Sequence, residues 1–448
     1  MVACKFKNIL IVDGYATGSQ YAGRIKARNL VPYHITSGWE KHTSFTPEFM
    51  DKYIASQVQG RYAECFRMPD DMDEAVEMLK KYNFQAVIPG TETGVIAAET
   101  LAQKLGLPTN KRNLLQARRD KFYMQMALKE AGLKYIDSFL AHDVEEAVQW
   151  YKKSGYPRIL IKPAKSAGTD GVGTANNEEE LRQYFTHSYL HKYDAAGNYN
   201  DALLLQEYIV GDEMVVNCVS REGRHVLTDV VLYNKVMTPN GVPIYDASRL
   251  IHHLDERFSE AVQYTFKVLD ALGIQYGSSH SEIKLTPQGP VLVETGARVM
   301  GSTPENYYEA LGYSLIDWSL DSYLDDAAHL AHSQQKYAPK KHFLAKFFIS
   351  SEDAPITALH APETLKMLPS FATCNFNTLN ISKQLKKTVD IPSKPGDCLL
   401  ISDDEQTLLR DYNLCRYLEK CATELLWTKK DNKKVKGHQI DNVKSLSW

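Results

Sequence analysis

The chain has 448 residues, of which 44% are hydrophobic and 24% are charged, and its formal net charge is −3 at pH 7. This ordinary globular composition suits roughly three domains, and it offers neither the basic excess of a nucleic-acid-binding protein nor a strongly acidic tail. No apolar run reaches the roughly 18 residues of a membrane-spanning helix, and the first residues lack the apolar segment of a secretory signal, so we expect a cytoplasmic protein with no membrane partner. The seven cysteines form no CxxC pair, which disfavours a zinc or redox site.

The first third of the chain alternates between strand-like and helical segments. Residues 8–14 and 85–90 are apolar runs that end at a glycine, as buried strands often do, whereas apolar residues recur at helical spacing in 72–83 and 93–106. Strands that alternate with helices predict an α/β fold with a doubly wound parallel sheet. We assign residues 1–115 to such an N-terminal, Rossmann-like domain.

From Asp120 onward the pattern changes to mixed α and β structure. Asp120 is placed to cap a short helix that ends at Gly132. The other expected elements are strands at 158–163, 203–210, 214–220 and 397–402 and helices at 178–187 and 256–273. The expected regions are a central part at 116–332, a C-terminal α+β domain at 333–430, and a lysine-rich tail at 431–448.

A Thr-Pro-Gln-Gly turn signal between two strand-like runs predicts a β-hairpin. We take the last three of these residues as a three-residue loop, so that Thr286 faces Pro290. Counting back along both strands then places Glu282 opposite Glu294, with Cβ atoms about 4.5–5.5 Å apart.

The same register groups further functional side chains. Because every second side chain of a strand shares a face, His280 joins Glu282, and Arg298 joins Glu294 if the strand continues. Two ionised carboxylates so close together repel each other unless one is protonated or a cation lies between them, and paired carboxylates suit Mg²⁺. An exposed hairpin with two solvated glutamates is the alternative.

A loop of small residues and glycines follows Lys162, which ends an apolar strand. Close approach of its backbone would let N–H groups surround an anion, with Lys162 adding a positive charge, although a flexible hairpin tip has the same composition. The loop matches neither the P-loop nor the dinucleotide-binding pattern, and Gly14–Gly18 lacks the full dinucleotide fingerprint, so we do not expect NAD.

Taken in order, these pieces resemble the ATP-grasp superfamily of ligases over about residues 1–330. The resemblance implies that Lys121, at the helix start, and Lys162 contact the phosphates of ATP. It also implies a mobile loop over the phosphates, formed by Ser166, Gly168, Thr169, Gly171 and their neighbours.

The segment from Gln206 to Glu213 is similar to the hinge of that superfamily. The resemblance implies that the main chain around Glu207 and Ile209 binds adenine and that Glu213 holds the ribose. A plain buried strand with a turn is the alternative for this segment.

Glu282 and Glu294 match the paired metal carboxylates of the superfamily, for one or two Mg²⁺ ions with Mn²⁺ as a substitute. Arg298 matches the arginine that lies four residues after the second glutamate. Many members have Asn two positions after that glutamate, where this chain has Gly296. The small residue resembles the L-amino-acid ligases of the bacilysin-synthesis type, which make dipeptides.

The resemblance implies an ATP-dependent ligase that joins a carboxylate, expected to belong to an amino acid, to an amine through an acyl phosphate. ADP and phosphate would be released, Arg298 would stabilise the acyl phosphate and the tetrahedral intermediate, and His280 would orient or deprotonate the amine, unless it is a structural histidine. A homodimer is compatible with the resemblance. The rival interpretations are a biotin-carboxylase-like or purine-pathway ligase, a non-catalytic ATP-binding module and, disfavoured, a dehydrogenase.

Overall fold

The N-terminal strands at residues 8–12 and 84–89 are buried over most of their length, as is typical of a parallel sheet with both faces covered. The computed structural model describes residues 8–41, 46–166, 171–194, 197–237, 243–301, 303–391 and 393–430, and it divides the chain into two units, Met1–Phe343 and Leu344–Trp448. The expected tail at 431–448 lies outside the described residues, and the expected domain limits stay predictions.

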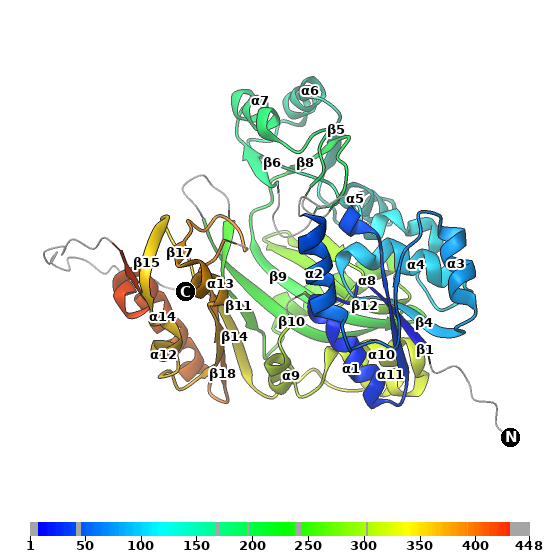
Figure 1. Ribbon diagram of the computed structural model, residues 1–448. Coiled ribbons are helices and arrows are strands. Elements are labelled where there is room, and N and C mark those ends of the chain that lie inside the picture. Colours follow the sequence, from blue (N-terminus) through cyan, green and yellow to red (C-terminus); the bar gives the residue numbers. More distant parts are fainter. Residues whose placement is uncertain are drawn as a thin grey trace, which may run out of the picture. The chain divides into compact units, whose positions relative to one another are not determined.

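A parallel sheet in the order β3-β2-β1-β4 opens the first unit. The interior residues of β1 from Ile9 to Val12 are fully buried, and α3 and α4 pack on one face of the sheet while α1 packs against β2. The prediction of a doubly wound parallel α/β domain is confirmed (Figure 1). Its elements are β1 (Asn8–Val12), α1 (Tyr21–Ala27), β2 (Val31–Thr36), α2 (Pro47–Val58), β3 (Cys65–Arg67), α3 (Met72–Lys80), β4 (Phe84–Pro89) and α4 (Val95–Lys104).

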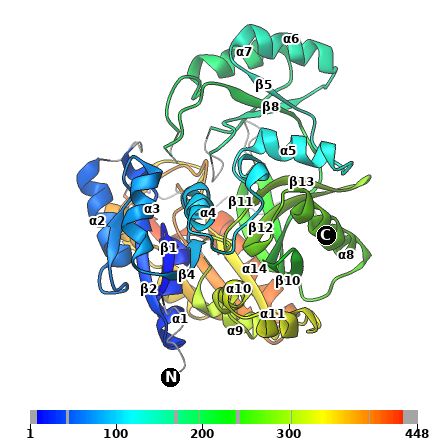
Figure 2. The same cartoon turned by 90° about the vertical axis from the view of Figure 1, so that its right-hand side faces the viewer.

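A four-stranded antiparallel sheet in the order β5-β8-β6-β7 follows, with its own apolar core under two helices (Figure 2). The helices begin at good caps, since Asp143 and Asn177 each accept hydrogen bonds from main-chain N–H groups of the first turn. The elements are β5 (Ser138–Ala141), α6 (Val144–Ser154), β6 (Ile159–Lys162), β7 (Gly173–Ala175), α7 (Glu178–His187) and β8 (Leu203–Glu207).

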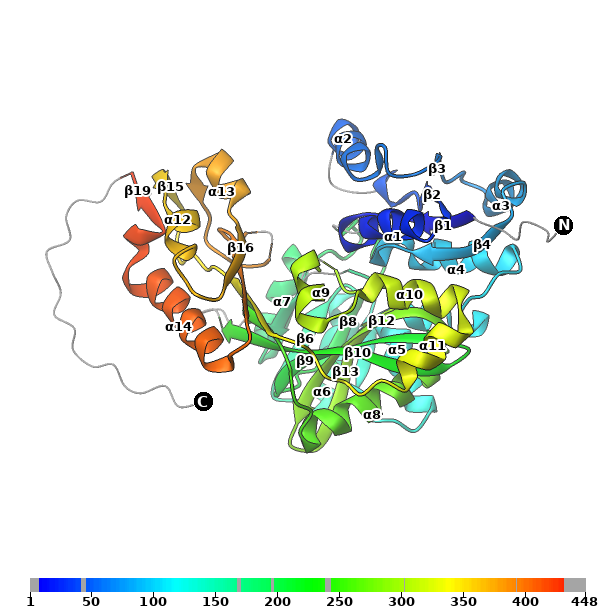
Figure 3. The same cartoon turned by 90° about the horizontal axis from the view of Figure 1, so that it is seen from below.

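The largest antiparallel sheet of the first unit has the order β13-β12-β9-β10-β11. The helices α5 and α8 bury their apolar sides on it in one core, and α10 contacts β9 and β12 (Figure 3). The elements are α5 (Lys121–Glu130), β9 (Asp212–Arg221), β10 (Arg224–Met237), β11 (Pro243–Leu250), α8 (Glu256–Ala271), β12 (Tyr276–Thr286), β13 (Gly289–Gly296), α9 (Glu305–Leu311), α10 (Leu315–Leu324) and α11 (Asp326–Ser333).

Polar contacts tie the N-terminal sheet to this larger sheet. The Tyr21 hydroxyl lies 2.7 Å from Ser319 Oγ on α10, and Gln20 Nε2 donates to the Thr303 carbonyl at 2.8 Å. The N-terminal sheet is therefore held in place beside the strands that carry the paired glutamates.

The second unit is an α+β arrangement, as predicted. Its buried ion pair joins Lys346 Nζ to Glu419 Oε2 at 2.8 Å. The elements are β14 (His342–Phe347, which begins at the unit boundary), β15 (Ala354–Leu359), α12 (Ala361–Leu365), β16 (Phe371–Asn375), α13 (Asn377–Ser382), β17 (Gln384–Leu385), β18 (Asp397–Ser402), α14 (Glu405–Cys421) and β19 (Trp427–Lys429). Within the described parts of both units, none of the helices combines the length and the apolar character that crossing a membrane requires.

Candidate active site

The two glutamates face each other across the hairpin of β12 and β13, as the sequence predicts, but by a different route. Glu282 pairs with Glu294, whereas Thr286 pairs with Gly289, so the predicted pairing of Thr286 with Pro290 is wrong. The turn is one residue shorter than expected, and a bulge that leaves Val293 unpaired restores the register. The predicted pair survives because the short turn and the bulge cancel.

Lys121 is the cation that neutralises Glu294. Asp120 caps α5 by accepting the Phe122 N–H at 2.9 Å, and this places Lys121 in the first turn of the helix. Lys121 Nζ lies 2.8 Å from Glu294 Oε2 and donates to the Ser166 carbonyl at 2.6 Å. Burial alone would raise the pKa of Glu294, but Lys121 and Lys162 outweigh it and bring the pKa down to about 2.

Lys162 ends β6 and is buried beside the same cluster. Burial, followed by the charge of Lys121, lowers the pKa of Lys162 to about 8, although Glu294, Glu282 and Glu213 act in the opposite direction. The two lysines expected to contact phosphates are thus electrostatic neighbours of each other and of Glu294, and Lys162 is also a neighbour of Glu282.

Glu213 lies at the start of β9 between two lysines that sequence reasoning missed. Its carboxylate pairs with Lys235 and, at 3.1 Å, with Lys284 Nζ. Burial opposes ionisation, but these two lysines hold the pKa of Glu213 below its ordinary value. Glu213 therefore carries a negative charge in this buried position.

The expected hinge has two parts, the end of strand β8 and the link that follows it. Gln206 is buried in β8, where its side-chain amide donates to Ser138 Oγ at 2.9 Å, and the Glu207 N–H donates to the Asp137 carbonyl at 3.1 Å. Strand β8 ends at Glu207, so the predicted strand 203–210 is too long, and Ile209 lies in the link between β8 and β9.

Part of the expected phosphate loop lies outside the described residues, namely Gly168 and Thr169. Ser166 supplies the carbonyl to Lys121, and Gly171 has a φ of +66°, where a Cβ would collide with the Tyr189 ring. The Tyr184 hydroxyl donates to the Gly171 carbonyl, so α7 anchors the end of the loop.

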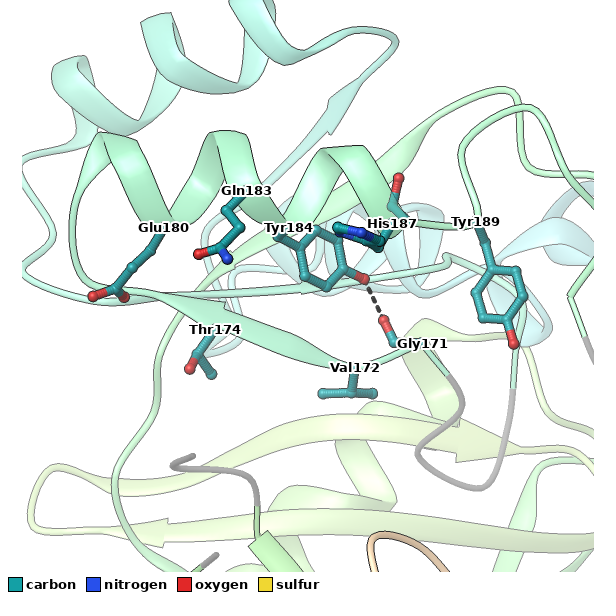
Figure 4. A pocket seen from close by; sticks show the side chains of 9 residues that line it. Gly171, Val172, Thr174, Glu180, Gln183, Tyr184, His187 and Tyr189 are labelled. Carbon is teal, nitrogen blue, oxygen red and sulfur yellow. Dashed lines mark hydrogen bonds between the residues drawn. The ribbon is translucent and has the colours of Figure 1, made fainter. Parts of the chain in front are cut away.

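Figure 4 shows an open pocket beside this anchor, between β7 and α7, which Val172, His187 and Tyr189 help to line. Its lining includes none of the site lysines or glutamates. We therefore place the candidate chemistry at the hairpin rather than in this pocket.

His280 is fixed by a chain of buried hydrogen bonds. Asn217 Nδ2 donates to Asp229 Oδ2 at 2.6 Å, so its amide oxygen, 2.8 Å from His280 Nδ1, faces the ring as an acceptor. The Tyr307 hydroxyl also donates to Asp229 at 2.7 Å. With Nδ1–H used in this way, His280 Nε2 faces Glu282 Oε1 at 3.8 Å, on the face that the sequence predicts.

Arg298 lies two residues beyond the end of β13, so the strand does not continue to it as the sequence argument supposed. It nevertheless remains near Glu294, whose pKa its charge helps to lower. Its Nε lies 3.0 Å from Glu92 Oε2, and Arg119 Nη1 lies 3.7 Å from Glu92 Oε1.

Glu92 also explains the glycine at position 296. A Cβ there would lie 2.6 Å from Glu92 Oε2 and 3.1 Å from Arg298 Cζ. The space that a larger side chain would need is taken by the carboxylate and the guanidinium. Gly296 is thus matched to a glutamate that comes from another part of the chain.

Sequence reasoning missed Glu92, Arg119, Asn217, Lys235 and Lys284. One usable signal existed for Glu92, which follows the carboxyl end of β4, the edge where ligands bind in parallel sheets. Asn217, Lys235 and Lys284 become visible only when β9 is paired with β10 and β12, and Arg119, which lies outside the strands, only when the folded chain brings it to Glu92.

Comparison with known proteins bears on this cluster. A family model described as "ATP-grasp domain" matches residues 154–304. Dapdiamide A synthase of Enterobacter agglomerans is 29% identical over 405 residues, which cover 89% of this chain and 93% of that protein.

Two solved structures share the fold at low identity. An L-amino acid ligase from Bacillus licheniformis has a TM-score of 0.68 and 16% identity, covering 92% of this chain and 97% of that one. The biotin carboxylase domain of the Hydrogenobacter thermophilus 2-oxoglutarate carboxylase, determined with MgADP and bicarbonate, has a TM-score of 0.62 and 14% identity, covering 95% and 91%. Since both chemistries occur on this fold, the fold alone does not choose between them.

Proposed function

The chain is an ATP-grasp ligase, and from this premise we propose that it joins the carboxylate of an amino acid to an amine through an acyl phosphate, releasing ADP and phosphate. The observation that carries the proposal is the cluster in which Lys121, Lys162 and Arg298 surround the Glu282–Glu294 pair. Phosphoryl transfer needs positioning and charge stabilisation above all, and this cluster supplies both.

The lysines would receive the phosphates. Lys121 is paired with Glu294, so ATP binding would exchange a carboxylate oxygen for a phosphate oxygen. Burial lowers the pKa of Lys162 to about 8, and a neighbouring phosphate would favour its charged form. Glu213, at the start of β9, would hold the ribose, and the main chain around Glu207 and Ile209 would contact adenine.

Glu282 and Glu294 would hold one or two Mg²⁺ ions, for which Mn²⁺ could substitute. Their side-chain oxygens come from facing positions of one hairpin and Glu294 is ionised, which suits a hard cation held by carboxylates together with substrate phosphates. When bound, the metal would neutralise charge on the phosphates.

The amide forms in two steps. The substrate carboxylate attacks the γ-phosphorus and ADP leaves; the amine then attacks the carbonyl carbon of the acyl phosphate and phosphate leaves. Arg298 would stabilise the negative oxygens in both steps, and Glu92 would hold its guanidinium in place. His280, with Nε2 turned toward Glu282, would orient or deprotonate the amine.

Pairwise amino-acid mixtures, assayed for ADP release with products identified by mass, test this function. Replacing Arg298→Ala should reduce ligation roughly 10²–10³-fold while nucleotide binding survives. The control Arg257→Ala removes an exposed arginine of α8 and should leave ligation unchanged. ADP release that depends on bicarbonate instead of an amine would contradict the proposal and favour a carboxylase.

We also propose that the enzyme is cytoplasmic and acts on small molecules. Light scattering during gel filtration would test the homodimer that the resemblance suggests.

A further inference from the structure

A group of aromatic rings closes over the carboxyl edge of the N-terminal sheet, away from the residues of the proposed chemistry. Tyr15 packs on Ile54 and Val58 of α2, with its ring centroid 5.8 Å from that of Tyr53 and 5.4 Å from that of His34. Two further rings complete the group, which we call the aromatic chamber: Tyr15, His34, Trp39, Tyr53 and Tyr62.

At the chamber lie buried polar atoms that have no hydrogen-bond partner among the residues that the structure describes. They are Tyr15 Oη, His34 Nε2, Thr36 Oγ1, Trp39 Nε1, Glu40 Oε2 and Tyr62 Oη. The Tyr15 and His34 side chains are only 2% and 1% exposed. An unpaired buried polar atom is costly and rare in a native protein, so six of them beside one sheet edge point to a ligand that supplies their partners.

Two carboxylates at the chamber, those of Asp13 and Glu40, have no cation paired with them in the described parts of the chain. Asp13 is fully buried and accepts hydrogen bonds only from neutral donors, the Ser37 N–H and hydroxyl and the Thr93 hydroxyl, at 2.6–2.8 Å. Burial, aided by the charge of Glu40, raises the pKa of Asp13 to about 6 against the effect of those hydrogen bonds.

The neighbouring basic groups do not act as counterions to these two carboxylates. Arg67 is influenced by Glu40, but Asp51 Oδ1 holds its guanidinium at 2.7 Å. Burial lowers the pKa of His34 to about 4, so His34 is neutral near pH 7. The chamber is therefore acidic, and the described residues supply no counterion to it.

Several acidic and phenolic groups act on the Tyr15 hydroxyl. Burial chiefly raises the pKa of Tyr15, and Asp13, Glu40, Tyr53 and Tyr62 raise it further. Aromatic faces beside carboxylates attract an organic ammonium.

We propose that the aromatic chamber binds the side-chain ammonium of a substrate amino acid. The inference rests on the proposed ligase function. The chamber and the proposed reaction centre share one turn, the 3₁₀ helix η3 (Glu92–Gly94), because Thr93 donates to Asp13 while its neighbour Glu92 pairs with Arg298. An α-ammonium lies only two bonds from its own carboxylate, so a carboxylate at Arg298 would reach the chamber through its longer side chain.

Direct binding separates this inference from the ligase function. Calorimetry of the nucleotide-free protein with L-lysine, L-ornithine and L-norleucine compares two amine-bearing side chains with a neutral one of similar length. We expect lysine or ornithine to bind about tenfold more tightly than norleucine. Equal binding of the three amino acids would overturn the chamber even if ligation occurs. Preferential binding without any ADP release would support the chamber and contradict the ligase.

A charge-removing variant tests the acid. Glu40→Gln should reduce the preference for lysine over norleucine to about twofold, while Glu48→Gln, which removes an exposed carboxylate at the start of α2, should leave it intact. If Glu40→Gln retains the full preference for lysine over norleucine, the chamber does not bind the ammonium.

A hydroxyl-removing variant distinguishes binding from folding. Tyr15→Phe deletes an atom that has no hydrogen-bond partner among the described residues, so the melting temperature of the free protein should stay the same or rise. Affinity for lysine should nevertheless fall about three- to tenfold if the hydroxyl contacts the ligand. A variant that melts earlier and binds lysine normally would assign the hydroxyl a purely structural role and contradict the proposal.

Discussion

Glu294 and Asp13 are largely buried carboxylates in the same unit, yet their pKa values move in opposite directions. Burial raises both, but Lys121 and Lys162 reverse the effect at Glu294 and bring it to about 2, whereas Asp13 has only neutral donors and rises to about 6. The comparison teaches that the proposed reaction centre contains its own counterions, whereas none for the aromatic chamber lies in the part of the chain that the structure describes.

The difference extends to the neighbours of each acid. Glu213 pairs with two lysines and Glu92 with two arginines. Like Glu294, both acids therefore have basic partners in the reaction centre. A ligand must exchange places with existing ion pairs there, whereas it would add a missing charge in the chamber. Variants of the two regions should therefore differ in what they change.

The largest effect is expected when the reaction centre loses its ionised acid. Glu294→Gln should lower ADP release about 10³-fold, because the amide ligates Mg²⁺ poorly and no longer balances Lys121. The measurement is ADP release across a magnesium titration, with the exposed Glu260→Gln on α8 as a control expected to match the wild type. An unchanged magnesium dependence would remove Glu294 from the metal site.

A smaller loss is expected when the Glu92–Arg298 pair is displaced. Gly296→Ala places a Cβ within 2.6 Å of Glu92 Oε2, so the carboxylate must move and the guanidinium loses its anchor. We expect kcat to fall about 10²-fold with a small change in melting temperature. Gly23→Ala on α1, where a Cβ meets no atom within 4 Å, should leave kcat unchanged. A normal kcat for Gly296→Ala would mean that the pair does not position Arg298.

Nucleotide affinity should respond to the acid between the two lysines. Glu213→Gln removes the charge that Lys235 and Lys284 share, and it weakens the expected ribose contact. We expect the KM for ATP to rise about tenfold with kcat nearly unchanged. Asp212→Asn, at the exposed neighbouring position, is the matched control. A change confined to kcat would count against a ribose role.

The sequence predicted local features well and long-range contacts poorly. Helix α7 begins and ends where the sequence predicts, because Asn177 caps it and its apolar spacing is clear. The pairing of Glu282 with Glu294 was also predicted, although the bulge at Val293 has no local sequence signal. Glu92 could not be assigned to the site, since its approach to Arg298 depends on how the N-terminal sheet packs on the hairpin. The aromatic chamber has the same origin, because its rings come from separate turns, from β2 and from α2.

The smallest effect is expected at Asp13, and its sign follows from the missing counterion. The pKa is about 6 in the folded protein against the ordinary 3.8, so ionisation of Asp13 costs the folded state stability. This cost is absent at low pH, grows as the pH rises from about 4 to about 6, and stays constant above that range, with an upper limit near 3 kcal/mol. Asp13→Asn keeps a side chain that tolerates the positive φ of 53° and can accept the Ser37 N–H.

We expect this variant to gain about 1 kcal/mol and to melt roughly 2 °C above the wild type near pH 7.5, and to lose most of that advantage near pH 4.5. Thermal unfolding at the two pH values measures it. A bound ammonium would stabilise ionised Asp13, so lysine should raise the melting temperature of the wild type more than that of Asp13→Asn. If the advantage of the variant were the same at both pH values, the buried carboxylate would not be the cause, and the contrast with Glu294 would fail.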